Sequence, residues 1–220
     1  MDPLSDEALA IVVPIVVYWL YSGLYMALGH SISMDKYRLH SKEEEDAKNL
    51  VSRRDVVMGV LLQQLVQAAV AAATFTLAGE RRTTTAPSSW LAVAARFAVG
   101  MVVLDGWQYA WHRWMHTNRF LYRRVHSWHH RLVAPYAFGA QYNHPAEGLL
   151  LDTVGGAVAF LASGMSPRAS VAFFSLCTAK GVFGTHMPYV VEERPGGGLQ
   201  VRPVDMSPSS ATAAAGSGGK

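Results

Sequence analysis

The sequence predicts an all-α fold, an integral membrane helical bundle with a cytosol-facing cap of histidine-rich helices. Two observations predict the bundle. Half of the 220 residues are apolar and only 16% are charged, against about 25% in soluble globular proteins, and long stretches carry no charge. A third observation predicts the cap, because five of the nine histidines lie within residues 112–130.

The first two transmembrane helices are predicted over residues 8–29 and 56–79, which carry no charge. Each run reaches the length of about 20 residues that a helix needs to cross a bilayer. The preceding sequence MDPLSDE has no Lys or Arg, so the first run is expected to remain as an anchor and not to be cleaved as a secretory signal. Pro14 does not argue against this helix, since neighbouring groups in a membrane bundle can take up the freed carbonyl.

The basic residues predict the orientation of the chain. Residues 30–55 contain six Lys and Arg, whereas residues 1–7 contain none. By the positive-inside rule the amino terminus is lumenal, the 30–55 loop is cytosolic, and the short segment after the second span is lumenal. The same rule accounts for the net charge of +3. No basic face stands apart from the spans, so nucleic-acid binding is excluded.

A third apolar segment, residues 90–104, returns the chain to the cytosolic side just before the histidines. Arg96 interrupts it, and a charge at this depth is expected to face the bundle interior and pair, with Asp152 as the candidate partner. The glutamines Gln63 and Gln67 of the second span lie one helical turn apart and are expected to bond to another helix.

The last apolar pieces, residues 148–165 and 170–178, are separated by Ser-Pro-Arg and are expected to be too short for two crossings. They predict a re-entrant or interfacial hairpin. Residues 1–89 are expected to form an N-terminal membrane region with two transmembrane helices and a cytosolic loop. The small, polar residues 205–220 are expected to be a disordered tail.

The spacing of the clustered histidines points to metal binding. His112 and His116 are four residues apart, and His126, His129 and His130 are three and four apart, so each group lies on one face of a helix. Two short helices can then aim five imidazoles at one point. Imidazole suits iron, copper, zinc and nickel, and five ligands exceed the four of a tetrahedral zinc. Cys177 is the only cysteine, which excludes thiolate clusters.

Three further residues are candidates for this site. Asp105 precedes His112 by two helical turns and is expected to orient a ligand from outside. Asn143 is a second such residue, and His144 is a sixth candidate ligand. The alternative to a metal site is an interfacial belt of Trp, Arg and His at the membrane surface. Such a belt requires no helical spacing of its histidines. His30, His40 and His186 are isolated and are expected to be ordinary polar residues, although His40 could fold toward the site.

The motif HxxxH followed by HxxHH, in a multi-span protein, resembles the fatty acid hydroxylase superfamily of di-iron membrane oxygenases. This motif pair is shared by sterol desaturases, sterol methyl oxidases and lipid hydroxylases, and does not choose among them. The stretches DGWQYAWHRWMHTNRFLYRRVHSWHHRLVAPYAFGAQYNHPAEG and MPYVVEERPGGGLQVRP are more specific and closely resemble plant sphingoid base (sphinganine) 4-hydroxylases. The resemblance covers most of residues 8–204, with one break.

The resemblance implies a function. In that family, two irons held by three histidine clusters use dioxygen to hydroxylate carbon 4 of a long-chain base in the endoplasmic reticulum membrane. Electrons come from NAD(P)H through cytochrome b5 and its reductase. His112 and His116 match the first cluster, and His126, His129 and His130 match the second. Residues 90–180 then form an incomplete fatty acid hydroxylase domain, and residues 181–204 a family-like C-terminal segment.

The third histidine cluster of the family is absent. SLCTAK, which ends at residue 180, runs almost directly into GVFGTHMPY, as an internal deletion from splicing or an error in gene prediction would produce. A second iron would lack ligands, so impaired sphinganine 4-hydroxylation is expected. One alternative is a non-catalytic isoform that associates with the full-length hydroxylase, and ceramide synthase is a further possible partner. A metal transporter is disfavoured, because the spans hold few ionisable groups.

Overall fold

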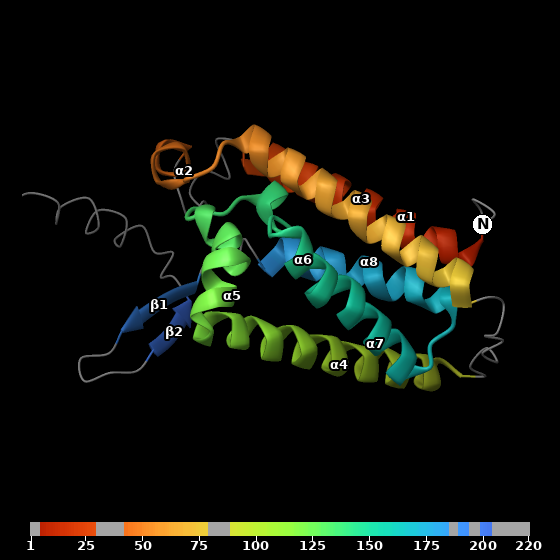
Figure 1. The fold of residues 1–220 in the computed structure, drawn as a ribbon. Helices are drawn as coiled ribbons and strands as arrows, with labels where there is room; N and C mark the ends of the chain where they lie inside the picture. Colours follow the sequence, from red (N-terminus) through yellow and green to blue (C-terminus); the bar gives the residue numbers. More distant parts are fainter. Residues whose placement is uncertain (1–4, 30–41, 79–88, 185–188, 194–198, 204–220) are drawn as a thin grey trace, which may run out of the picture.

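The computed structural model describes residues 5–29, 42–78, 89–184, 189–193 and 199–203. Long helices run side by side and form a bundle, with α5 at the end of α4 (Figure 1). The elements in chain order are α1 (Asp6–Gly29), α2 (Lys42–Lys48), α3 (Arg53–Ala78), α4 (Trp90–Thr117), α5 (Arg119–Arg124), η2 (His126–Arg131), η3 (Ala137–Gly139), α6 (Pro145–Gly148), η4 (Leu149–Val154), α7 (Gly155–Ser163), α8 (Pro167–Gly184), β1 (Tyr189–Glu193) and β2 (Leu199–Pro203).

Four helical segments of the described residues are long and apolar enough to cross a membrane. They are Asp6–Gly29, Arg53–Thr76, Trp90–Thr117 and Pro145–Ser163. The first two confirm the predicted spans. Apolar side chains such as Leu20, Leu65 and Val102 are largely exposed on the outside of the bundle, as expected where a helix faces lipid.

The third helix is longer than the sequence predicted. No proline interrupts α4, and its ends are marked by Ser89, whose Oγ accepts from the Ala92 amide, and by Asn118. Its 28 residues span about 42 Å, against about 30 Å for the hydrocarbon core. His112 and His116 are therefore carried on the last turns of the membrane helix itself and not on a separate short helix.

The fourth span is longer than its apolar run. Helical structure begins at Pro145, three residues before the apolar run, and α6, η4 and α7 follow one another without a break to Ser163. The first arm of the predicted hairpin is therefore long and apolar enough to cross, whereas the second arm, α8, is not among the candidate spans of the described residues, in agreement with the expectation that the two pieces are too short for two crossings. Gly164 ends the first arm in the left-handed conformation, with a φ of 63° that favours glycine, and α8 follows alongside α1.

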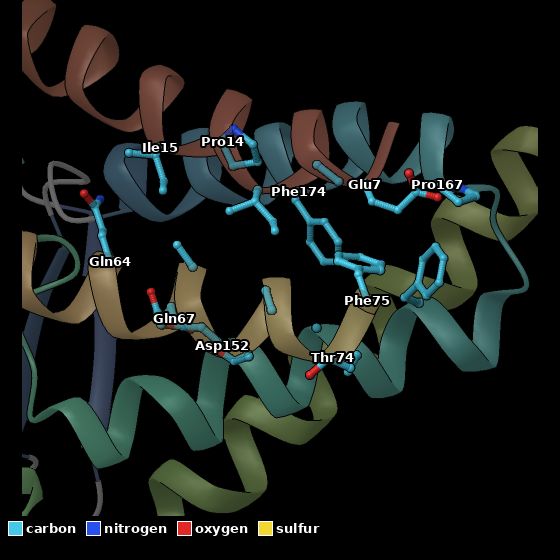
Figure 2. Close-up of a pocket in the computed structure, with 18 of the residues that line it drawn as sticks. Glu7, Pro14, Ile15, Gln64, Gln67, Thr74, Phe75, Asp152, Pro167 and Phe174 are labelled. Carbon is cyan, nitrogen blue, oxygen red and sulfur yellow. The ribbon is translucent and has the colours of Figure 1, made fainter. Parts of the chain in front are cut away.

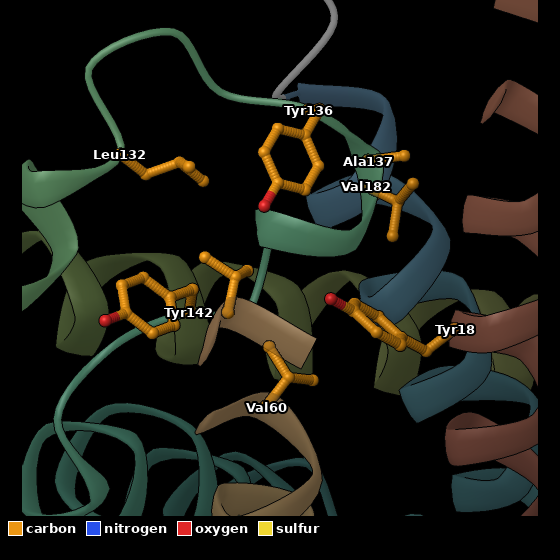
Figure 3. Packing of buried hydrophobic residues seen from close by; sticks show 8 residues of the cluster. Tyr18, Val60, Leu132, Tyr136, Ala137, Tyr142 and Val182 are labelled. Atoms are coloured by element: carbon orange, nitrogen blue, oxygen red, sulfur yellow. The ribbon is translucent and has the colours of Figure 1, made fainter. Parts of the chain in front are cut away.

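A cluster of buried side chains fixes the loop between the histidine helix η2 and α6 (Figure 3). Tyr18 of α1 donates its hydroxyl hydrogen to the Phe138 carbonyl at 2.8 Å, and Ser22 donates to the Ala137 carbonyl at 3.3 Å. Around these bonds pack Val56, Val60, Leu132, Tyr136, Ala137, Tyr142 and Val182. The loop that follows the histidines is thus attached to α1, α3 and α8.

Glutamines of α3 form the polar links inside the bundle, as predicted for Gln63 and Gln67. The Gln67 amide nitrogen donates to the Gly148 carbonyl at 3.0 Å and to Asp152 Oδ2 at 3.2 Å. The Gln63 side chain lies against Asn143, and with its amide turned to the orientation that its neighbours require, its nitrogen donates to the Asn143 backbone carbonyl at 3.1 Å. These bonds attach the start of the fourth span to α3.

The predicted pair of Arg96 and Asp152 does not form. Asp152 accepts from Gln67 and, at 3.1 Å, from Gln108. Arg96 lies beside Phe97 and Met165, and its buried Nη1 has no hydrogen-bond partner among the described residues. Asp152 is held instead by amide donors of α3 and α4, one on each oxygen.

The all-α prediction is confirmed for the bundle, and one small addition lies outside it. Strands β1 and β2 pair antiparallel, with Val191 opposite Val201. The sequence did not predict this hairpin. His30, His40 and His186, residues 30–41 of the predicted cytosolic loop, nearly all of the predicted lumenal segment and the tail at 205–220 lie outside the described residues.

Gly155→Ala should destabilise the bundle. A Cβ at Gly155 would lie 2.6 Å from Trp107 Cδ1, and the ring is held by its bond from Nε1 to the Leu150 carbonyl at 2.8 Å. We expect a loss of about 1–3 kcal/mol, typical of overpacked interiors, seen as a lower midpoint of thermal unfolding in detergent. Gly106→Ala is the matched control, because a Cβ there meets nothing within 4 Å. Equal midpoints for the two variants would contradict this packing.

Candidate metal centre

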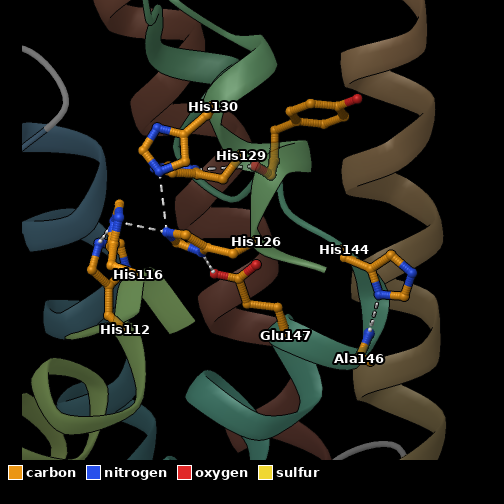
Figure 4. Close-up of polar contacts among 9 residues, drawn as sticks. His112, His116, His126, His129, His130, His144, Ala146 and Glu147 are labelled. Atoms are coloured by element: carbon orange, nitrogen blue, oxygen red, sulfur yellow. Dashed lines mark hydrogen bonds and ion pairs between the residues drawn. The ribbon is translucent and has the colours of Figure 1, made fainter. Parts of the chain in front are cut away.

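The five clustered histidines meet at one end of the bundle (Figure 4). His112 and His116 come from the last turns of α4, and the other three come from the 3-10 helix η2. The ring centroid of His126 lies 4.5 Å from those of His112 and His116, and 4.8 Å from that of His130. The convergence that the spacing predicted is present in the structure.

Asn118 is the local reason for this convergence. Its backbone ends α4, and its Oδ1 accepts from the amides of Phe120 and Leu121 at 3.0 and 3.1 Å, so it also starts α5. An asparagine at such a junction satisfies amides that have no helical partner. The chain therefore turns at the end of α4, and α5 delivers His126 beside His116.

The spacing of the ring nitrogens suits a shared metal ion. Successive Nε2 atoms are 3.2 Å apart from His112 to His116, 3.0 Å from His116 to His126, and 3.1 Å from His126 to His130. Two nitrogens that bind one ion at about 2.1 Å lie about 3.0–3.4 Å apart. Ligand atoms of His112, His116 and His126 all lie within 4.8 Å of one another. One ion therefore fits the nitrogens present.

Glu147 holds the central histidine from the other side. The Nδ1 of His126 and Oε1 of Glu147 are 2.7 Å apart, and the two side chains are 0% and 2% exposed. Donation of Nδ1–H to the carboxylate leaves Nε2 of the neutral ring with a lone pair directed at His116 and His130. A carboxylate behind a histidine is the usual outer support of a metal ligand.

Burial and crowding keep His126 and His130 neutral. The pKa of His126 is lowered to about 4 by burial, and further by His116 and His129. The pKa of His130 is lowered to about 4 for the same reasons, burial first. Both rings are uncharged near pH 7, the form in which imidazole binds a metal.

His129 is at the edge of the group. Its ring centroid lies 6.0 Å from that of His126 and 6.4 Å from that of His112, and its Nδ1 is 3.3 Å from the Tyr142 carbonyl. That carbonyl belongs to the loop that α1 and α3 hold. His129 therefore connects the histidine group to the core cluster of Figure 3.

The structure gives the other three predicted residues different partners. His144 caps α6 by accepting from the Ala146 amide at 3.2 Å, and it lies apart from the five histidines (Figure 4). Asp105 is bound to Lys180 of α8 at 2.6 Å. Asn143 lies against Gln63. Neither Asp105 nor Asn143 contacts a histidine, and the carboxylate that does is Glu147.

Sequence reasoning missed Glu147, although one signal was present. It is an acidic residue in the first turn of an apolar helix, three residues after His144. A carboxylate so close to a membrane span costs energy unless it has a polar partner, which here is His126. Elsewhere among the described residues no other group of three or more His, Cys, Asp or Glu is close enough to hold an ion.

A cavity of about 880 Å³ opens in the bundle between α1, α3, α7 and α8 (Figure 2). Its walls are mainly apolar and include Phe75, Phe160 and Phe174. Polar side chains, Gln67 and Asp152 among them, line one part of it. The helical segment that carries Asp152 also carries Glu147, so the cavity and the histidine group share a structural element.

Comparison with known proteins finds a hydroxylase family and relatives that are named as hydroxylases. Residues 97–202 match the sequence model of the family described as Fatty acid hydroxylase. Sphinganine C4-monooxygenase 1 of Arabidopsis thaliana is 47% identical over 249 aligned positions, covering 90% of this chain and 95% of the relative. Sphingolipid C4-hydroxylase sur2 of Schizosaccharomyces pombe is 36% identical, covering 84% and 73%.

One relative carries a different name. Very-long-chain aldehyde decarbonylase GL1-9 of Oryza sativa subsp. japonica is 51% identical over 188 positions, covering 84% of this chain and 73% of the relative. No solved structure matches the chain. Because the Arabidopsis relative is 47% identical and is covered over 95% of its length, this histidine-bearing membrane protein belongs to the fatty acid hydroxylase family, whose members are iron-dependent oxidoreductases.

Proposed function

We propose that the histidine group binds iron for the hydroxylation of carbon 4 of sphinganine, with dioxygen as co-substrate and phytosphingosine as product. The observation that carries this proposal is the row of Nε2 atoms of His112, His116, His126 and His130, each 3.0–3.2 Å from the next. The buried Glu147 supports the central ring of this row from its other side. Relatives from a plant and a yeast that are named for this oxidation support the choice of substrate.

The name of the rice relative means that family membership alone does not choose the reaction. The two Arabidopsis relatives, both named as sphinganine C4-monooxygenases, are covered over 95% and 97% of their lengths, whereas the rice relative is covered over 73%. The wider coverage favours hydroxylation of a long-chain base.

Each group of residues in the site would have its own role in the reaction. His112, His116, His126 and His130 would hold the metal through Nε2, and Glu147 keeps the His126 ring in the tautomer that can bind. When bound, iron supplies the activation of dioxygen and the removal of hydrogen from an unactivated carbon. The cavity would take the apolar chain out of water, and the loop fixed by Tyr18 contacts His129 through the Tyr142 carbonyl.

The same proposal includes the setting of the reaction. The site faces the cytosol from a multi-pass protein of the endoplasmic reticulum membrane. Electrons come from NAD(P)H through cytochrome b5 and its reductase. The orientation is supported by the basic residues of α2 and of the start of α3, which lie at the same end of the bundle as the histidines (Figure 1).

We also propose that this chain is impaired. Its alignment with the Arabidopsis relative is 249 positions long, more than its own 220 residues, so the relative contains residues with no counterpart here. The missing residues supply the third histidine cluster that the resemblance implies. The histidines present fit one ion, and a second would lack ligands. The alternative is a non-catalytic isoform that associates with the full-length hydroxylase and forms no product by itself.

Iron content tests the metal site directly. We expect the purified chain, loaded anaerobically with ferrous iron, to hold a single iron that His126→Ala abolishes, measured by plasma mass spectrometry. Glu147→Gln should weaken binding by about 10- to 100-fold, because it removes the support of the ligand. His144→Ala is the control and should leave binding unchanged. Equal losses in His144→Ala and His126→Ala would contradict the ligand set.

A repaired chain tests the reaction. We expect little phytosphingosine, measured by mass spectrometry, in cells that lack their own 4-hydroxylase and express this chain. Inserting the additional segment of the Arabidopsis relative after Lys180 should restore the product, because it completes the ligands of the second ion. The same insert with alanine at its histidines is the control.

Two outcomes would count against this account. A repaired chain that folds and binds iron but forms no phytosphingosine would contradict the assigned reaction. Full activity of the unrepaired chain would contradict the proposed impairment. Co-purification of the unrepaired chain with a full-length hydroxylase, without any product of its own, would favour the isoform alternative.

A further inference from the structure

Asp152 is a carboxylate within the fourth span that lines the cavity of Figure 2. Its Oδ2 accepts from Gln67 of α3 at 3.2 Å, and its Oδ1 accepts from Gln108 of α4 at 3.1 Å. Two helices therefore hold the carboxylate in place. Neither it nor its two amide partners is used by the histidine group.

The backbone around Asp152 is irregular and supported by side chains. Leu149–Val154 forms a single π-helical turn, η4, in which the usual hydrogen-bond pattern is shifted. Two carbonyls of this region accept from side chains instead, Gly148 from Gln67 and Leu150 from Trp107. Such turns within α-helices occur frequently at functional sites. Here the turn presents Asp152 to the cavity.

The charge of Asp152 has no counterion in the part of the chain that the structure describes. Both of its bonds come from neutral amides, and Arg96, the expected partner, lies elsewhere. Carboxylates at membrane depth normally pair with a cation, because an isolated charge is poorly solvated there. Asp152 thus leaves a place for a cation on the wall of the cavity.

The cavity itself indicates which kind of cation. Its volume of about 880 Å³ lies in the range of about 300–1,000 Å³ that small-molecule sites occupy. Aromatic side chains of α3, α7 and α8 form the apolar walls. A ligand with a positive head and a long alkyl chain satisfies both the carboxylate and these walls.

We propose that Asp152 binds the protonated amine of a long-chain base and so selects the free base over its N-acylated form. This inference rests on the proposed function and deepens it. An ammonium group donates a charge-assisted hydrogen bond to a carboxylate, whereas the amide nitrogen of a ceramide is neutral and loses the charge of that contact.

The position of Asp152 along the helix agrees with attack at carbon 4. Glu147, which contacts His126, precedes Asp152 by five residues, a rise of about 7 Å. In a long-chain base the amine is on carbon 2. The path from the carboxylate to carbon 4 consists of a salt contact of about 2.8 Å, one carbon–nitrogen bond and two carbon–carbon bonds. Its total length is comparable to the helical rise of about 7 Å. The separation of the two carboxylates along the helix therefore matches the length from the amine contact to carbon 4.

Binding of radiolabelled sphinganine to the chain in nanodiscs, without iron, tests this inference. We expect N-acetylsphinganine to bind at least about 10-fold more weakly than sphinganine. Asp152→Asn should weaken sphinganine binding by about 10- to 100-fold, because the charge of the contact is lost while its shape is kept, and should not affect N-acetylsphinganine. Asp152→Glu should recover part of the affinity.

Glu7→Gln is the matched control, because Glu7 is an acidic residue of α1 that lines the same cavity. We expect it to leave sphinganine binding unchanged. The proposal is overturned if Glu7→Gln causes the loss instead, if Asp152→Asn binds sphinganine as tightly as the original chain, or if the two lipids bind equally. The lipid comparison uses the unmodified chain, so the test stands even if a variant fails to fold.

The outcome is separable from that of the reaction assay. Asp152-dependent binding together with a repaired chain that forms no phytosphingosine would uphold the amine site and reject the assigned reaction. Product formation together with equal binding of the free and acylated bases would uphold the assigned reaction and reject the amine site.

Discussion

The buried contact between His126 and Glu147 is the constraint on which the candidate site depends. It joins the 3-10 helix after α4 to the start of the fourth span, across 21 positions of sequence. It selects the tautomer of His126 and directs the Nε2 lone pair at two further imidazoles. Tyr18 and Ser22 of α1 hold two carbonyls of the intervening loop and so help to fix its path. The geometry of the metal centre is thus supported from the opposite side of the bundle.

The segment from Pro145 to Val154 links the two functional regions. Its first turn supplies Glu147 to the histidines, and its π-helical turn supplies Asp152 to the cavity. Gln67 bonds to both the backbone and the carboxylate of this segment, so α3 fixes one region relative to the other. A membrane enzyme that oxidises one carbon of a long chain needs such a fixed distance between the anchor of the substrate and the metal.

Local properties of the sequence predicted much of this structure. Hydropathy located the spans, and helical spacing brought together His112, His116, His126 and the rest, because both depend on neighbours within a few residues. The sequence did not show which residues, far apart along the chain, form pairs. Asp105 pairs with Lys180, 75 positions away, and not with His112, and Arg96 does not meet Asp152. The apolar run alone does not give the full length of the fourth span, because its helix starts at Pro145, before that run begins.

Iron K-edge X-ray absorption of the iron-loaded, purified chain tests the central claim most directly. The account predicts the scattering pattern of several imidazoles at about 2.1 Å and no iron–iron contribution, because the Nε2 atoms of His112, His116, His126 and His130, each 3.0–3.2 Å from the next, fit one ion. Loss of the imidazole pattern in Glu147→Gln, at equal iron content, would show the supporting role of the carboxylate. An iron–iron distance of about 3.5–4 Å, or a pattern without imidazole, would contradict the account.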